Sequence, residues 1–132
     1  MRMVILMLAC LAGPAVAAPV AGAWLTDDGD GIVEISPCGE KMCGRLAKAL
    51  APIKGPTVDR NNPHPALRNR PIIGLPVLLD FVREGLVWRG HIYDPRHGRH
   101  YRATLERIAA DRLKVRGCIS VLCRTITWTL AR

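Results

Sequence analysis

Residues 100–117 read HYRATLERIAADRLKVRG, and this stretch decides the fold. In 100–106 the apolar side chains Tyr, Ala and Leu alternate with polar ones, and 112–117 repeats the pattern with Leu and Val. Alternation with a period of two is typical of a strand that buries one face. The stretch therefore predicts two strands joined by a turn at 107–111, with Arg102 opposite Arg116 on the outer face.

The same alternation recurs at 33–36 and 125–130, and no segment carries a long helical stripe. Turn-forming residues separate these runs at 27–31 and 94–98. Several short strands with regular turns predict an all-β sandwich or barrel of about eight strands. We expect the buried face to contain Trp24, Val33, Ile35, Trp88, Ile92, Tyr101, Leu105, Leu113, Val115, Ile126 and Trp128.

The N-terminus has the pattern of a secretory signal peptide. A positive start precedes an apolar run from Val4 to Ala12, and Ala15-Val16-Ala17 fits the small-residue cleavage rule. We expect residues 1–17 to be removed and 18–132 to form one mature domain in the periplasm or outside the cell. Lipidation at Cys10 is the alternative, with a poorer match to its motif.

Length and charge exclude several classes of protein. The chain has 132 residues and a formal net charge of +8, which is too short for a doubly wound or barrel α/β enzyme. Export makes nucleic acid an unsuitable partner, so the basic surface suggests an anionic envelope polymer or lipid head group, or simply a solvated face. We expect a monomer with peripheral envelope contact at most.

The mature chain keeps four cysteines, in two pairs with four residues between the members of each pair. An even number of cysteines in an exported protein indicates disulfides rather than a zinc site of thiolates. Local pairing of Cys38 with Cys43 and of Cys118 with Cys123 suits hairpins, at about 2 kcal/mol each. A Cys38–Cys118 bridge would contribute about 4.5 kcal/mol in the same entropy model.

Residues 51–76 are rich in Pro, Asn and Arg and predict a long irregular loop. Long loops in compact domains are often functional. We expect this loop to cap a barrel mouth through which a small apolar or amphipathic ligand enters. Trp88 and Tyr93 are the candidates for the wall, Asp59 and Asn62 for the rim, and Asp94 is a further candidate contact.

Two other chemistries fit parts of the sequence. Asp59 and Asp94 are an acid–base pair for an envelope-directed hydrolase, if the fold brings them together. His91, His97 and His100 lie around one turn and suit a transition metal. The acidic residues at 27–30 fail the EF-hand calcium spacing, and His64 is expected to be merely exposed.

A set of ordered motifs covers the mature chain. They include GAWLTDDG at 22–29, VEISPCG at 33–39, DRNNP at 59–63, RPIIGLP at 70–76, GHIYDP at 90–95 and RTITW at 124–128. The chain resembles the bacterial secreted family known as domain of unknown function 2147. This resemblance implies a small exported β-rich protein and supplies no reaction, ligand or catalytic residue. His91 and His97 replace the residues more usual in that family.

A weaker resemblance is to the closed end of lipocalin-type barrels, carried by Gly22 and Trp24 as Gly-x-Trp. In those barrels a Trp plugs the closed end and an Arg packs across it, a part for Arg124 or Arg132 here. The resemblance favours a small antiparallel lipocalin-like barrel. The predicted function is a periplasmic binding protein, without cofactor and without an assigned catalytic residue.

Overall fold

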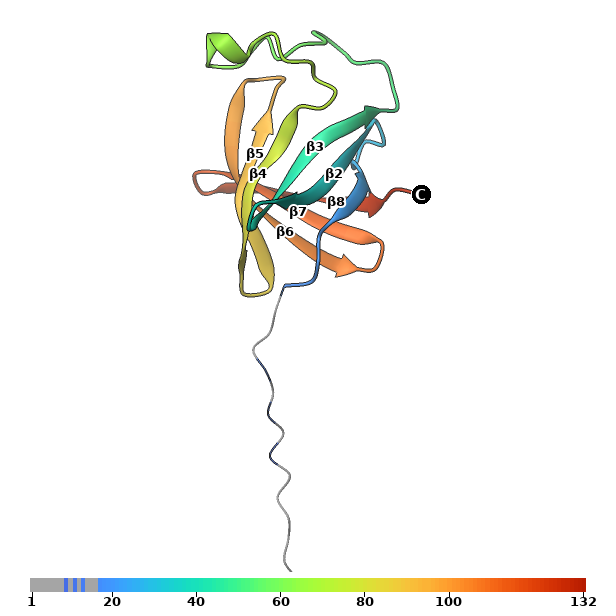
Figure 1. Ribbon diagram of the computed structural model, residues 1–132, viewed down its shortest axis with the longest axis vertical. Helices are drawn as coiled ribbons and strands as arrows, with labels where there is room; N and C mark the ends of the chain where they lie inside the picture. Colours follow the sequence, from blue (N-terminus) through green and yellow to red (C-terminus); the bar gives the residue numbers. More distant parts are fainter. Residues whose placement is uncertain (1–8, 10, 12, 14–16) are drawn as a thin grey trace, which may run out of the picture.

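The computed structural model describes residues 9, 11, 13 and 17–132, and in this part the chain is a closed antiparallel barrel (Figure 1). Each strand pairs with its neighbours in sequence, and the last strand pairs with the first. The predicted all-β barrel is therefore confirmed. The strands are β1 (Gly22–Leu25), β2 (Gly31–Cys38), β3 (Lys41–Ala49), β4 (Pro76–Glu84), β5 (Val87–Asp94), β6 (Arg99–Ala109), β7 (Arg112–Ile119) and β8 (Leu122–Leu130).

The hairpin of β6 and β7 corrects the predicted register. Thr104 pairs with Arg116 and Glu106 with Lys114, so Arg102 lies opposite Cys118 and not opposite Arg116. The turn is shorter than expected, because β6 continues to Ala109 through a bulge at the end of the hairpin. The new register separates two like charges and forms an ion pair of 3.0 Å between Lys114 and Glu106.

A bulge in β4 breaks the alternation that sequence reasoning relies on. Asp80 has a φ of 55°, and the pairing of β4 with β5 shifts between Leu79 and Val82. The bulge turns Phe81 into the core, where it is fully buried. Phe81 packs on Gly90, since a Cβ at that position would lie 2.7 Å from Cγ of Phe81. Only glycine leaves room for the ring.

Inward-facing side chains of the strands form one hydrophobic core. The residues expected on the buried face are all buried or partly buried, with Trp24 and Leu105 fully enclosed. A second, smaller cluster of Ile72, Leu75 and Tyr93 packs the 51–76 loop against the barrel. The loop holds only a short 3-10 helix, η1 (Pro65–Leu67), and lies across one end of the barrel (Figure 1).

The other end of the barrel is covered by residues 17–20. The indole Nε1 of Trp24 donates to the carbonyl of Val20 at 2.9 Å, and Nε1 of Trp88 donates to that of Ala18 at 3.0 Å. Arg107 donates to the carbonyl of Pro19, and its guanidinium lies 5.3 Å from the centre of the Trp24 ring. The arginine across Trp24 is thus Arg107, and the expectation of Arg124 or Arg132 was wrong. Both of those residues are exposed.

Four cysteines form the two local disulfides, Cys38–Cys43 and Cys118–Cys123. The first closes the β2–β3 hairpin and the second the β7–β8 hairpin. These pairings confirm the local assignment and exclude both the long Cys38–Cys118 bridge and a zinc site of four thiolates.

Most of the predicted signal peptide lies outside the described residues, and Cys10 lies there too. Among the residues that are described, no helix has the length and apolar character needed to cross a membrane.

Candidate functional site

A cavity of about 900 Å³ opens at the end of the barrel beneath the 51–76 loop. Its wall consists of side chains from β2, β3, β4, β5 and β8, because alternate residues of each strand point inward. These wall residues are Val33, Leu46, Leu78, Ile92, Ile126 and Trp128. A space of this size is within the range of sites for small organic ligands.

The roof of the cavity is mostly apolar and the rim is polar. Pro52, Ile53 and Val58 of the loop cover the space. The rim contains the carboxylates of Asp28, Asp30 and Asp94, together with the cationic side chains of Lys54 and Arg96. An apolar interior with a polar rim suits a ligand that has an apolar body and a polar end.

One polar atom of the wall has no partner. Trp128 is 7% exposed and lines the cavity. Its Nε1 is buried and donates to no atom of the residues that the structure describes. Buried indole N–H groups usually find an acceptor, so this group is available to an oxygen of a bound molecule.

The loop is held on the barrel by a buried polar network around Asp59. This carboxylate is fully buried and accepts three hydrogen bonds, from Tyr93 Oη at 2.5 Å, Asn62 Nδ2 at 2.8 Å and Arg70 Nη2 at 3.1 Å. The backbone N–H of Asp59 also donates to the carbonyl of Arg70. The network joins both arms of the loop to β5.

The network shifts the acidity of its two central groups. Burial raises the pKa of the Asp59 carboxyl, but the hydrogen bonds from Tyr93, Asn62 and Arg70 outweigh burial, and the net pKa is lowered. Burial, together with the adjacent Asp59 carboxylate, raises the pKa of Tyr93 to about 12. At neutral pH the pair is therefore a phenol that donates to a carboxylate.

A further contact joins the loop to the turn between β5 and β6. Asn61 Nδ2 donates to the carbonyl of Arg96 at 2.9 Å. Gly98 has a φ of 63°, and a Cβ there would clash with the carbonyl oxygen of Asn61. The loop and the turn are in direct backbone contact, which only glycine permits.

The predicted ligand residues fall into three places. Tyr93 and Asp94 line the cavity. Asp59 and Asn62 are buried beneath the loop, where Asn62 is 3% exposed, and they hold the cover in place instead of presenting side chains at the rim. Trp88 is at the opposite end of the barrel, beside Ala18.

The three histidines do not converge. His97 Nδ1 lies 2.7 Å from Asp94 Oδ2 at the cavity rim, whereas His100 packs on Tyr93 with ring centroids 4.8 Å apart. His91 pairs with Leu79 and Arg102 on neighbouring strands. In the described part of the chain no group of three His, Cys, Asp or Glu side chains is placed to hold a metal ion.

Sequence reasoning missed several residues of this site. Leu78 lies in β4, which begins at a proline and contains a bulge, so this strand shows no clean alternation in the sequence. Leu46 was not expected on the buried face, but it lies in β3 and faces the cavity. The signal that could have found Leu46 is its spacing: Met42, Gly44 and Leu46 are two positions apart, as expected for one face of a strand.

The family model described as "Uncharacterized protein conserved in bacteria (DUF2147)" matches residues 22–130, the whole barrel. The chain belongs to the DUF2147 family. No curated protein matches the DUF2147 chain.

Among solved structures, the DUF2147 chain is similar to "Protein HP1028 from the human pathogen Helicobacter pylori belongs to the lipocalin family". The two share 21% identity with a TM-score of 0.77, over 88% of this chain and 85% of that one. At this identity the likeness concerns the fold, and it confirms a lipocalin-like barrel.

Proposed function

We propose that this protein is exported to the periplasm and binds a small apolar or amphipathic molecule in the barrel cavity, as a monomer and without chemical turnover. The observation that carries the proposal is the cavity of about 900 Å³ with apolar walls beneath the loop. The lipocalin-like fold supports it, because barrels of this size can hold one small ligand.

The chemistry of the cavity narrows the class of ligand. The unpartnered Nε1 of Trp128 favours a molecule with a hydrogen-bond acceptor on or near its apolar part. The mixed charges of the rim, including Asp94 and Arg96, favour a polar end that remains in water. Both features fit an amphipathic ligand better than a pure hydrocarbon.

Binding suits these residues better than hydrolysis by Asp59 and Asp94. Asp59 is fully buried, ionised and committed to three hydrogen bonds. Such a carboxylate has no access to a substrate and its lowered pKa makes it a weak base. Asp94 by itself holds His97 and the backbone N–H of Arg96 at the rim.

Export is supported by the two disulfides, which form and persist in oxidising compartments. Fractionation of a bacterium expressing the full chain, with sequencing of the mature N-terminus, tests this part of the proposal. We expect the protein in the periplasmic fraction with Ala18 as its first residue.

Ligand binding is tested by titration with the apolar dye N-phenyl-1-naphthylamine, with native mass spectrometry of the purified protein. We expect dye fluorescence to rise on binding. Ile126→Trp fills the cavity and should weaken binding by about tenfold or more. Thr127→Trp, the next residue on the same strand but on the outer face, is the matched control. Equal binding by both variants would place the dye outside the cavity.

A further inference from the structure

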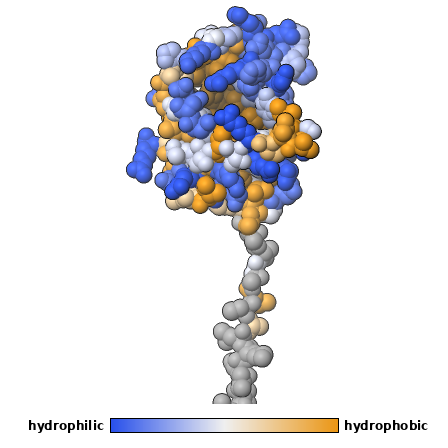
Figure 2. All heavy atoms as spheres, turned by 180° about the vertical axis from the view of Figure 1, so that it is seen from behind, coloured by the Kyte–Doolittle hydropathy of each residue, from blue (hydrophilic) through white to orange (hydrophobic). Residues whose placement is uncertain are grey.

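The turn between β7 and β8 presents three large apolar side chains to water. Ile119, Val121 and Leu122 are 55%, 89% and 77% exposed. The turn between β7 and β8 projects from the barrel (Figure 1), and hydrophobic atoms gather on a protrusion at the corresponding edge of the space-filling view (Figure 2). We call residues 118–123 the β7–β8 tip. Exposed apolar groups gathered on one projection are typical of an interaction site.

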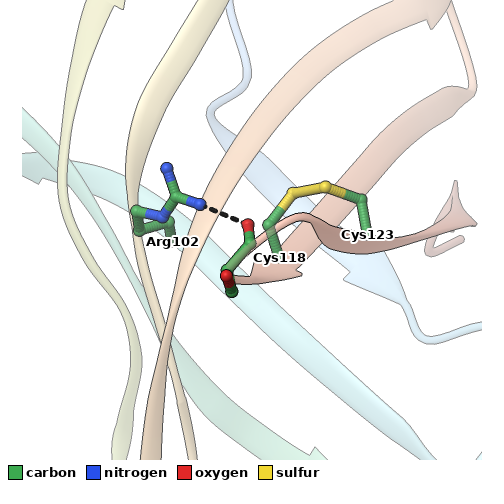
Figure 3. The surroundings of a disulfide bond; sticks show 4 residues. Arg102, Cys118 and Cys123 are labelled. Atoms are coloured by element: carbon green, nitrogen blue, oxygen red, sulfur yellow. Dashed lines mark hydrogen bonds between the residues drawn. A yellow bond between two sulfur atoms is a disulfide. The ribbon is translucent and has the colours of Figure 1, made fainter.

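The tip is held rigid by its own contacts. Cys118 and Cys123 form a disulfide across its base. Arg102 of β6 donates from Nη2 to the carbonyl of Ser120 at 2.6 Å, as Figure 3 shows. The apolar side chains are therefore held in position before any partner is met, and this lowers the entropy lost on binding.

The charged residues of β7 and β8, the two strands that carry the tip, all have one sign. Residues 112–132 contain five Lys and Arg residues and no Asp or Glu. Arg116 and Arg124, on the two strands that carry the tip, are exposed. Arg102 adds a third cation at its base. A partner for this surface must accept apolar side chains and also carry negative charge.

We propose that the β7–β8 tip docks on the surface of a bilayer that contains anionic phospholipid. Val121 and Leu122 would enter the boundary between head groups and acyl chains, while the arginines face the anionic head groups. A convex tip suits a soft lipid surface better than a rigid protein groove. A second copy of this chain would bring like charges together. The proposal does not depend on a ligand in the cavity.

The test is co-sedimentation of the protein with vesicles of phosphatidylcholine alone and of phosphatidylcholine mixed with phosphatidylglycerol. The protein is purified from a bacterium expressing the full chain. We expect binding to the mixed vesicles, weakening as salt is added, and little binding to neutral vesicles. Absence of binding to the mixed vesicles at low salt would overturn the proposal.

Matched variants locate the contact. Leu122→Ser should weaken binding by about tenfold. Leu86→Ser should leave binding unchanged, because Leu86 is 58% exposed on the β4–β5 turn at the opposite end of the strands. Arg116→Gln should weaken binding about fivefold, and Arg112→Gln, at the other end of β7, should have a smaller effect. Equal losses within each pair would contradict docking through the tip.

Sedimentation velocity without lipid tests whether the tip instead joins two copies of the protein. We expect a monomer for the wild type and for Leu122→Ser. Self-association that Leu122→Ser abolishes would identify the tip as a contact between copies and would overturn the lipid proposal. Circular dichroism of each variant checks that the barrel is folded.

Discussion

The hydroxyl of Tyr93 donates to Oδ1 of Asp59 at 2.5 Å, although the two residues are 34 positions apart in the chain. Tyr93 belongs to β5 and Asp59 to the 51–76 loop. This bond therefore joins the cover of the cavity to the barrel. It is charge-assisted and buried, which places it among the stronger hydrogen bonds of proteins.

Replacing Tyr93 by Phe should destabilise the protein by about 2 kcal/mol, because a buried carboxylate loses one of its donors. Urea unfolding followed by tryptophan fluorescence measures the change. The control is Tyr101→Phe, since Tyr101 is the other tyrosine of the chain and is only partly buried. Equal losses of unfolding free energy in the two variants would contradict a stabilising hydrogen bond from the Tyr93 hydroxyl to Asp59.

The Asp59 network predicts a loss of stability in acid. The pKa of Asp59 is lower in the folded protein than in the unfolded chain, so its contribution is present above the ordinary Asp pKa of about 3.9. That contribution is lost as the pH falls toward the folded-state value. The urea midpoint measured from neutral pH downward should fall for the wild type. Asp59→Asn should have a lower urea midpoint at neutral pH, and its midpoint should depend less on pH in the acid range.

Gly98→Ala tests the contact between the loop and the β5–β6 turn. The new Cβ meets the carbonyl oxygen of Asn61, and φ is positive, so we expect a loss of about 2 to 4 kcal/mol. Gly29→Ala is the matched control, because Gly29 has a φ of 76° with no atom within 4 Å of the added Cβ. The control should lose only about 1 kcal/mol from backbone strain. Similar losses would show that the loop moves freely away from the turn.

Arg107→Gln tests the closed end of the barrel. The variant loses the cation over the Trp24 ring and the donor to Pro19, and we expect a loss of about 1 to 2 kcal/mol. Amide hydrogen exchange should rise in residues 18–24 and stay unchanged in the 51–76 loop. Arg89→Gln, which removes an exposed ion pair with Glu84, serves as the control and should lose little. Unchanged exchange near Trp24 would contradict this role for Arg107.

The barrel was predictable from sequence because alternating strands carry most of its wall. The alternation in β6, β7 and β8 correctly predicts that Leu105, Val115 and Trp128 are buried. The bulge at Asp80 was not predictable, because it moves Phe81 to the core face against the strand period. The β6–β7 register failed for the same kind of reason, since a bulge changes the count of residues in the turn.

The candidate site was only partly predictable, because its loop is organised by contacts distant in sequence. The sequence predicted Asp59 at the rim of the barrel mouth, but nothing local showed that it would meet Tyr93 and be fully buried. The histidines are close in sequence but have different neighbours: His97, in the turn after β5, contacts Asp94, whereas His100 of β6 packs on Tyr93.

The pairing of β1 with β8, which closes the barrel, can form only late in the synthesis of the chain. It consists of two residue pairs, Trp24 with Leu130 and Leu25 with Thr129, which join the first strand of the barrel to the last. A polypeptide that emerges N-terminus first cannot make these pairs until its last residues arrive. Strand β1 therefore stays paired with β2 alone until β8 has been synthesised. The Cys38–Cys43 bridge, by contrast, can form early and hold the neighbouring β2–β3 hairpin during that delay.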